Sequence, residues 1–278
     1  MSLKLMYITN DPDVAKIAQQ AGVDRIFVDM EYIGKDLRQK NMDTVQNRHS
    51  LDDIRILRSV LEQSELLVRC NPIHKASEEY SSSAEEIDGI IENGADIIML
   101  PYFKTPQEVE IFVELVANRA KTMLLFETLE AIECIDDILQ IDGIDELYIG
   151  LNDLSLGYGK KFMFELLSDG TVEQIIEKFK IKNLPYGFGG LACIDGGLLP
   201  GSNVVIEHYR LGSSRVILSR SFCDTKKVND RNKIRQTFFT QIQRIRELEA
   251  FCREQNNDFF NENKLEIIEK IKHIKENL

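Results

Sequence analysis

Short, continuously apolar runs alternate with amphipathic segments along almost the whole chain. Runs without interleaved polar residues are typical of parallel strands that are covered on both faces. The eight runs lie at residues 4–9, 25–32, 65–72, 96–102, 121–128, 145–153, 186–194 and 215–222. Segments with helical periodicity follow them at 11–22, 50–61, 84–94, 105–120, 129–140, 170–180, 200–212 and from about 230. The pattern therefore predicts eight strand–helix units.

The boundaries of the helical segments support this division. Asp, Ser, Thr-Pro or Pro-Gly opens the segments, and Gly or Asn-Gly closes several of them. Eight such units predict an α/β protein with a (β/α)8 TIM barrel over residues 1–256. A doubly wound open sheet is the alternative, but the glycine fingerprint of a dinucleotide fold does not follow the first strand.

Residues 257–278 are predicted to form a helical extension beyond the barrel. Within it, Leu265, Ile268 and either Ile271 or Ile274 recur at helical spacing, so one face of this helix is apolar. An apolar face of this kind must be buried against another surface. We expect it to pack on a neighbouring subunit, which predicts a homo-oligomer.

Composition and charge narrow the class of protein. The chain is 43% hydrophobic and 29% charged, and no apolar run is long enough to cross a bilayer, so we expect no membrane partner. The first residues show no secretion signal and the five scattered cysteines indicate reduced thiols, which favours the cytoplasm. A net charge of -12 disfavours a nucleic-acid partner, and the locally basic stretch 210–246 is interpreted as a solvated helix face.

Polar residues follow the apolar runs at the points where the strands are expected to end. In a barrel the active site lies at the C-terminal ends of the strands. The residues concerned are Asp29, Glu31, Arg69, Asn71, Glu127, Asp153, Gly189 and Gly190. Glu127 and Asp153 follow neighbouring strands, so their carboxylates could share one hard divalent cation, with water and substrate oxygens completing its coordination.

Five motifs, in this order, carry a resemblance to a known family. DMEY, LLVRCNP, GADIIMLP, LLFETLEA and IGLNDLSLGYG resemble the HpcH/HpaI aldolase/citrate lyase family, over a stretch from about residue 23 to residue 222. The resemblance implies that Glu127 and Asp153 bind Mg2+ or Mn2+ and that Arg69 binds the carboxylate and the 2-oxo oxygen of a pyruvate-like unit. It also implies that the backbone of Gly150, Leu151 and Asn152 lines the substrate carboxylate, and that the last helix is exchanged between the subunits of an oligomer.

Two positions depart from the family pattern. Tyr32 stands where family aldolases usually carry a histidine base that is held by the Asp three residues earlier, here Asp29, and Leu125 replaces a frequent glutamine. A phenol titrates near ~10 and an imidazole near ~6.5, so tyrosine is a poor base at neutral pH. Another base could be hydroxide on the cation or His49, in the loop 34–50. Citrate-lyase-like relatives work without the histidine.

Each candidate also has a structural interpretation. Arg69 could be an ion-pair partner of Asp29 or Glu31, and His49 is favoured as a surface residue at a helix N-terminus. Gly189 and Gly190 could serve packing or substrate access. Lys104 is a weak candidate for a Schiff-base lysine.

The sequence therefore predicts a metal-dependent carbon–carbon lyase that cleaves a 2-oxo acid to a pyruvate-like enolate and an aldehyde. Arg69, Asp29 and Tyr32 are the candidate catalytic residues. A citrate-lyase-like acyl lyase and a non-catalytic ligand-binding barrel that lost its general base are the alternatives.

Overall fold

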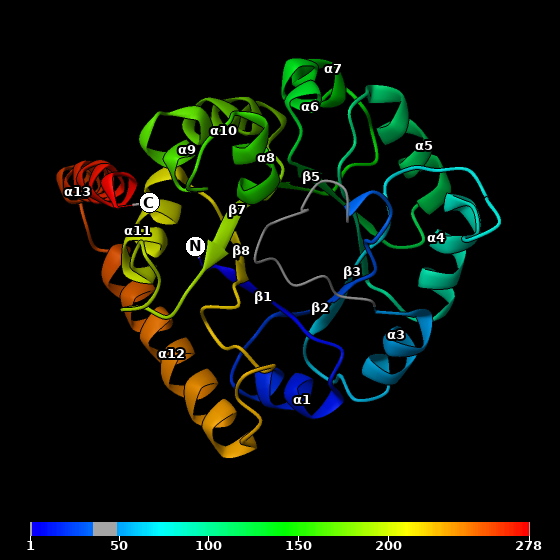
Figure 1. The fold of residues 1–278 in the computed structure, drawn as a ribbon, viewed down its shortest axis with the longest axis horizontal. Coiled ribbons are helices and arrows are strands. Elements are labelled where there is room, and N and C mark those ends of the chain that lie inside the picture. The colour runs from blue at the N-terminus through cyan, green and yellow to red at the C-terminus, as the bar shows by residue number, and fades with distance from the viewer. Residues whose placement is uncertain (1, 36–48, 278) are drawn as a thin grey trace.

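The fold is a closed barrel of eight parallel strands in sequence order (Figure 1). The computed structural model describes residues 2–35 and 49–277. The strands are β1 Lys4–Ile8, β2 Arg25–Asp29, β3 Glu65–Arg69, β4 Ile97–Leu100, β5 Lys121–Phe126, β6 Glu146–Ile149, β7 Tyr186–Leu191 and β8 Arg215–Leu218. The predicted (β/α)8 TIM barrel is confirmed, and the open-sheet alternative is wrong because β1 pairs with β8.

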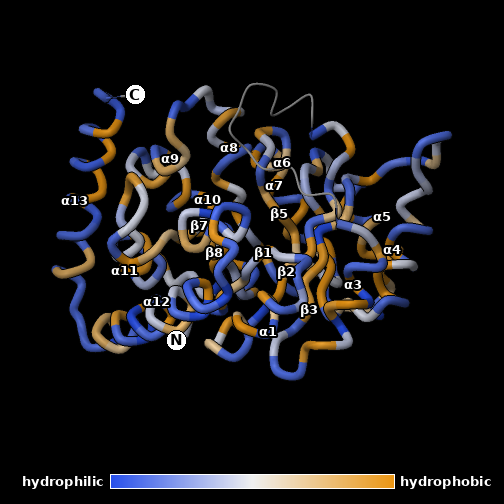
Figure 2. Tube along the Cα trace, turned by 60° about the horizontal axis from the view of Figure 1, so that its bottom comes forward, coloured by the Kyte–Doolittle hydropathy of each residue, from blue (hydrophilic) through white to orange (hydrophobic). Residues whose placement is uncertain are grey.

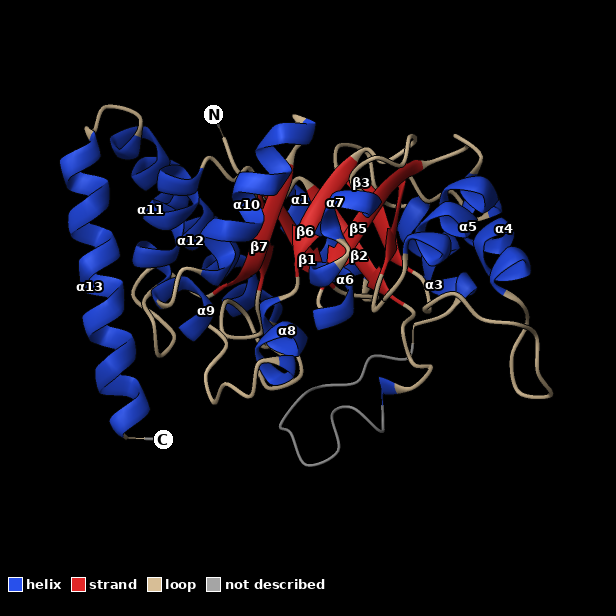
Figure 3. Cartoon of the chain, turned by 90° about the horizontal axis from the view of Figure 1, so that it is seen from above, coloured by secondary structure: helices blue, strands red, loops and turns tan. Residues whose placement is uncertain are grey.

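Helices surround the barrel on its outer side (Figure 3). They are α1 Pro12–Gln20, α3 Leu51–Arg58, α4 Ser83–Glu92, α5 Pro106–Val116, α6 Leu129–Glu133, α7 Ile135–Ile138, α8 Leu151–Gly157, α9 Glu165–Ser168, α10 Thr171–Lys182, α11 Gly201–Leu211, α12 Arg231–Cys252 and α13 Asn257–Glu276. Within residues 2–35 and 49–277, no helix is long and apolar enough to cross a membrane.

Two apolar layers form the core, because successive residues of a strand point to opposite faces of the sheet. On β2, Phe27 points into the barrel and Val28 points towards the helices. The interior layer contains Met6, Phe27, Leu67, Ile97, Met99, Met123, Leu125 and Tyr148. Figure 2 shows hydrophobic residues along the central strands and hydrophilic residues in many outer loops.

The predicted elements are corrected in two places. The helix expected over 129–140 is divided into α6 and α7 at Cys134. The strand expected over 145–153 ends at Ile149, and residues 151–157 form α8, which buries Leu151, Leu154 and Ser155. Burial at positions i, i+3 and i+4 is the spacing of a helix. The change from strand to helix could not be seen in the sequence because both parts lie in one apolar run.

The C-terminal helix α13 packs on the barrel of the same chain. It lies beside α11 at the edge of the molecule and also contacts α9 (Figures 1 and 3). Its buried apolar residues are Ile267 and Ile271, whereas Leu265 and Ile268 of the predicted stripe are exposed. Of the expected stripe, Ile271 is buried and is joined by Ile267, so the buried face is rotated from the expected one and packs on α11 and α9 of the same chain. Oligomer formation stays a prediction.

Candidate active site

Asp29 and Arg69 close β2 and β3 and lie opposite each other in register. Arg69 Nε donates to Asp29 Oδ1 at 2.8 Å, and Nη2 donates to Oδ2 at 2.9 Å. Arg69 Nη1 also lies 3.3 Å from Glu31 Oε2. The ion-pair interpretation of Arg69 therefore holds. A guanidinium has five N–H groups, so this pairing leaves N–H groups for a ligand.

The buried charges reinforce one another. Burial alone would raise the pKa of Asp29, but Arg69 and Lys35 hold it well below its usual range. Burial would likewise lower the pKa of Arg69, but Asp29, Glu31 and Glu127 raise it well above its usual value. Both groups are charged at every physiological pH. They form a fixed pair rather than a proton relay.

Lys35 is a member of this cluster that the sequence analysis did not single out. Its side chain is buried, and its Nζ lies 3.1 Å from Asp29 Oδ2 and 3.1 Å from Glu31 Oε2. The turn after β2 brings it there. Gly34 adopts a left-handed φ of 72°, and the Lys35 N–H donates to the Tyr32 carbonyl oxygen at 3.1 Å. The signal in the sequence was the acidic DME followed by a glycine and a lysine.

His49 lies against the end of β2 and is not a fully exposed surface residue. Its Nδ1 accepts the Asp29 backbone N–H at 3.0 Å. Burial, together with Lys226 and Lys35, lowers its pKa, against the opposing effect of Asp29 and Asp53. A neutral imidazole that accepts at Nδ1 carries its proton on Nε2, so His49 is a donor and not a base in this geometry. The neighbouring residues 36–48 of the expected loop lie outside the described chain.

Tyr32 is directed towards the loop between β3 and α4. The residue is 44% exposed, and its ring lies edge-on to Tyr80, with the centroids 6.5 Å apart. Burial, Glu86 and Tyr80 raise the pKa of Tyr32, which makes the phenol a still poorer base. The backbone N–H groups of Tyr32 and Ile33 both donate to Asn71 Oδ1 at 2.9 Å.

Asn71 is itself fixed by a buried carboxylate. Its Nδ2 donates to Glu86 Oε1 at 2.8 Å, and its backbone N–H donates to the same oxygen at 3.1 Å. Burial raises the pKa of Glu86. Asn71 therefore holds the turn after β2 in place and does not face a ligand as the sequence suggested.

Glu127 follows β5 and is almost completely buried. Its Oε1 accepts the Tyr102 backbone N–H at 3.1 Å, and Tyr102 adopts a left-handed φ of 48°. A Cβ atom at Gly150 would lie 2.7 Å from Glu127 Oε2, so the absence of a side chain at this position makes room for the carboxylate. Left-handed backbone in a non-glycine residue is a strained conformation of the kind found at functional sites.

Asp153 lies in the first turn of α8 and not at a strand end as expected. Phe126 and Ile149 are in register, so Glu127 and Gly150 leave β5 and β6 side by side, and Asp153 follows one helical turn later. Gly150 is the N-cap of α8, and no described side chain caps this helix. The N–H groups of its first turn therefore face the same end of the barrel as Glu127.

The described residues place four carboxylates, those of Asp29, Glu31, Glu127 and Asp153, at this end of the barrel. Those of Asp29 and Glu31 contact Lys35 and Arg69. Carboxylate oxygens are the ligands that Mg2+ prefers. Within the described residues, no group of three or more His, Cys, Asp or Glu side chains surrounds one point, so a cation here would need further oxygen ligands.

Gly189 and Gly190 form a bulge in β7 that a buried tyrosine holds. The register between β7 and β8 shifts between Gly187 and Gly190. The Tyr148 hydroxyl donates to the Gly189 carbonyl oxygen at 2.6 Å and accepts the Ile217 N–H at 2.9 Å. This supports packing as the role of these glycines. The sequence analysis missed Tyr148.

Lys104 lies at the rim of the barrel. Its Nζ is 2.8 Å from Glu130 Oε1, and its side chain is 43% exposed. The hydrogen bond to Glu130 raises its pKa. A Schiff-base lysine needs the opposite shift, so the structure disfavours that role.

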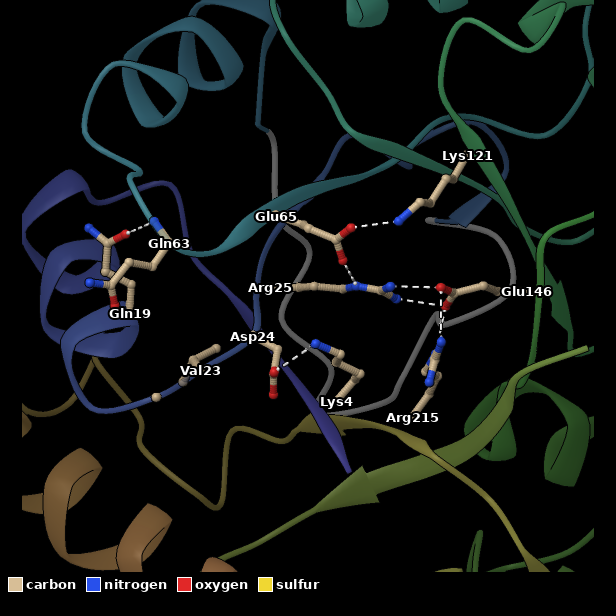
Figure 4. A pocket seen from close by; sticks show the side chains of 11 residues that line it. Lys4, Gln19, Val23, Asp24, Arg25, Gln63, Glu65, Lys121, Glu146 and Arg215 are labelled. Atoms are coloured by element: carbon tan, nitrogen blue, oxygen red, sulfur yellow. Dashed lines mark hydrogen bonds and ion pairs between the residues drawn. The ribbon is translucent and has the colours of Figure 1, made fainter. Parts of the chain in front are cut away.

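A cavity of about 390 Å³ lies at the opposite end of the barrel, where the strands begin (Figure 4). Arg25, almost completely buried, donates to Glu146 at 2.7 Å through both Nη atoms and to Glu65 at 2.9 Å through Nε. Arg215 Nε donates to Glu146 at 2.8 Å, and Lys121 Nζ donates to Glu65 at 2.7 Å. Chemistry in this fold lies at the other end, so we attribute this network to stability.

Comparison with known proteins identifies relatives of this chain. The model of the HpcH/HpaI aldolase/citrate lyase family matches residues 4–167. The match begins earlier and ends earlier than the resemblance suggested. A hydroxypyruvate/pyruvate aldolase of Roseovarius nubinhibens is 24% identical over 212 residues, which are 72% of this chain and 78% of the relative.

Solved structures share the fold. An HpcH/HpaI aldolase/citrate lyase family protein from Burkholderia cenocepacia superposes with a TM-score of 0.63 and 13% identity, over 84% of this chain and 95% of that one. The citrate synthase SbnG superposes with a TM-score of 0.58 and 16% identity, over 90% of this chain and 95% of that one.

Proposed function

Because the chain belongs to the HpcH/HpaI aldolase/citrate lyase family, we propose that it is a divalent-metal-dependent carbon–carbon lyase. Its substrate would be a 2-oxo acid, cleaved to a pyruvate-like enolate and an aldehyde. The observation that supports this most is the buried cluster at the C-terminal end of the barrel. There Arg69 is oriented by Asp29 and lies in the field of Glu127.

The metal-binding role goes to Glu127 and Asp153. A Mg2+ or Mn2+ ion held by them would act as a Lewis acid on the substrate oxygens. In sites of this kind such an ion stabilises the transition state by several kcal/mol. The space beside Gly150 leaves Glu127 Oε2 free of a side-chain clash from β6. Both carboxylates belong to elements that leave the barrel side by side.

The chain's own groups position the substrate. Arg69 would donate to the carboxylate and the 2-oxo oxygen, because its N–H groups not used by Asp29 and Glu31 are the ones left for a ligand. Asp29 fixes the plane of the guanidinium through two hydrogen bonds. The backbone of Gly150, Leu151 and Asn152, at the start of α8, would line the substrate carboxylate.

The test is pyruvate release from a panel of 4-hydroxy-2-oxo acids. The protein is treated with a chelator, freed of it, and assayed with and without added Mg2+ or Mn2+. We expect release only with added metal. Equal release without metal would exclude the metal-dependent mechanism, and no release from any substrate would favour a ligand-binding barrel.

We also propose that the chain forms a homo-oligomer. Leu265 and Ile268 of α13 are exposed apolar residues on the outer side of a helix that already packs on α11. A monomer mass in light scattering would exclude this.

A further inference from the structure

Lys35 has a position that calls for an explanation beyond charge balance. A lysine that is 4% exposed is uncommon, because burying its ammonium without partners is costly. Asp29 and Glu31, both almost completely buried, provide those partners at 3.1 Å each. An ammonium has three N–H groups, so two carboxylate contacts leave one for a ligand.

The same two carboxylates connect Lys35 to Arg69. Asp29 Oδ2 accepts from both Lys35 Nζ and Arg69 Nη2, and Glu31 Oε2 lies within 3.3 Å of a nitrogen of each. A 2-oxo acid held by Arg69 would therefore lie beside the Lys35 ammonium. Within the described residues, no other lysine contacts Asp29 or Glu31.

The other candidates for proton transfer are less suitable. His49 Nδ1 is occupied by the Asp29 N–H, and burial keeps the ring neutral with its remaining proton on Nε2. The Tyr32 ring lies against Tyr80, on the side of the β3–α4 loop.

We propose that Lys35 exchanges the proton with the aldehyde-derived oxygen when the carbon–carbon bond is made or broken. This inference rests on the proposed lyase function. In cleavage, the Lys35 ammonium first passes one proton to solvent, the resulting amine takes the C4 hydroxyl proton, the C4–O bond becomes a carbonyl, and the C3–C4 electron pair passes to the enolate. In condensation, enolate C3 attacks the aldehyde carbon, and the ammonium protonates the oxygen that receives the carbonyl π pair.

Two substitutions distinguish proton transfer by Lys35 from a purely electrostatic effect of its positive charge. Lys35→Met removes the ammonium, and Lys35→Arg keeps a cation beside Asp29 and Glu31 that cannot be deprotonated. We expect both to reduce kcat for cleavage of a 4-hydroxy-2-oxo acid by ~10²–10⁴-fold. Oxaloacetate decarboxylation, which forms the enolate without removing a hydroxyl proton, should change by less than ~10-fold. Lys104→Met, at the exposed lysine on the neighbouring loop, is the matched control and should leave both activities unchanged.

Other results would overturn the inference. Cleavage at native rates in Lys35→Arg would show that only charge is needed. A covalent pyruvate adduct on Lys35 after borohydride treatment, seen by mass spectrometry, would make it a Schiff-base nucleophile instead. Should Lys35→Met fail to fold, Lys35→Ala assayed with added ethylamine is the substitute, and recovery of cleavage supports proton transfer. Absence of both reactions in the native protein would refute the lyase function itself, whereas the variant results concern Lys35 alone.

Discussion

The two ends of β2 and β3 carry the same kind of ion pair with the charges exchanged. At the start of the strands Arg25 of β2 is in register with Glu65 of β3, and at their ends Asp29 of β2 is in register with Arg69 of β3. The difference lies in the surroundings. Around Arg25 the cations Lys4, Arg25, Lys121 and Arg215 exceed the carboxylates Asp24, Glu65 and Glu146 by one charge. Around Arg69 the carboxylates of Asp29 and Glu31 contact both Arg69 and Lys35, and Glu127 also interacts with Arg69 electrostatically.

The comparison shows that an ion pair alone does not mark a site. Arg25 donates to Glu146 through both Nη atoms and to Glu65 through Nε. All three nitrogens of its guanidinium are therefore hydrogen-bonded within the protein. Arg69 makes a similar set of contacts but is also affected by the charge of Glu127, the proposed metal ligand. A buried carboxylate such as Glu127 is a ligand that a divalent cation can take.

The largest expected effect is at the carboxylate-rich end. Glu127→Gln or Asp153→Asn should weaken Mn2+ binding and lower activity by at least ~10²–10³-fold, because each removes one of two anionic ligands. The free energy of unfolding should change by less than ~1 kcal/mol. Calorimetry with Mn2+ measures the binding, and Glu65→Gln at the other end is the control. Native Mn2+ affinity in both variants would disprove the metal assignment.

Breaking the other end should affect stability instead. Arg25→Met leaves Glu146 buried with Arg215 as its main partner and should lower the free energy of unfolding by ~3–5 kcal/mol. Arg119→Met, which removes an exposed pair with Asp88, should cost less than ~1 kcal/mol. Urea unfolding measures both. If Arg25→Met abolished activity in protein that stays folded, it would be wrong to assign stability to the end at Arg25 and catalysis to the end at Arg69.

Acid should weaken the end at Arg25. Burial alone would raise the pKa of Glu146. Hydrogen bonds from Arg25 and Arg215 have the larger opposite effect and lower this pKa to about 2. A carboxyl whose folded pKa is depressed stabilises the protein above its unfolded pKa, near ~4.5, and this stabilisation is lost as the pH falls towards 2. It amounts to about 3 kcal/mol. Urea unfolding between pH 7 and 3 should show a smaller loss in Glu146→Gln than in the native protein, and parallel curves would contradict the assignment.

The smallest effect is expected at Tyr32. Because its phenol lies by Tyr80 and not by Asp29, Tyr32→Phe should change cleavage and decarboxylation by less than ~10-fold, well below the usual contribution of a general base. Parallel steady-state assays of the two reactions test this. A selective loss of cleavage by ~10² or more would make Tyr32 the acid or base and would remove that role from Lys35.

The barrel and the ends of its strands could be predicted from the sequence because they depend on how apolar residues are spaced along each short segment. Asp29, Arg69 and Glu127 close apolar runs, and parallel strands bring such ends together whatever the intervening loops do. Asp153 was assigned to the same end for the wrong reason, since α8 begins inside the apolar run.

Contacts made by loops could not be predicted in the same way. Lys35 reaches the cluster through a turn that depends on the left-handed φ of Gly34, and Asn71 is turned away from the site by a hydrogen bond to Glu86 on α4. Neither contact leaves a periodic signal. The rotated apolar face of α13 was missed because Ile267 packs on a surface formed by other parts of the chain.

Gly150 ties two positions together over evolutionary time. A Cβ atom there would lie 2.7 Å from Glu127 Oε2 and 2.9 Å from Glu127 Cβ, and only the carboxylate end can move aside. A descendant that gains a side chain at 150 must therefore shift the backbone after β6, because shortening residue 127 still leaves its Cβ atom in the way. A descendant that loses the glutamate keeps the same restriction at 150. In a lineage that abandons this chemistry, position 127 should therefore change before position 150 does.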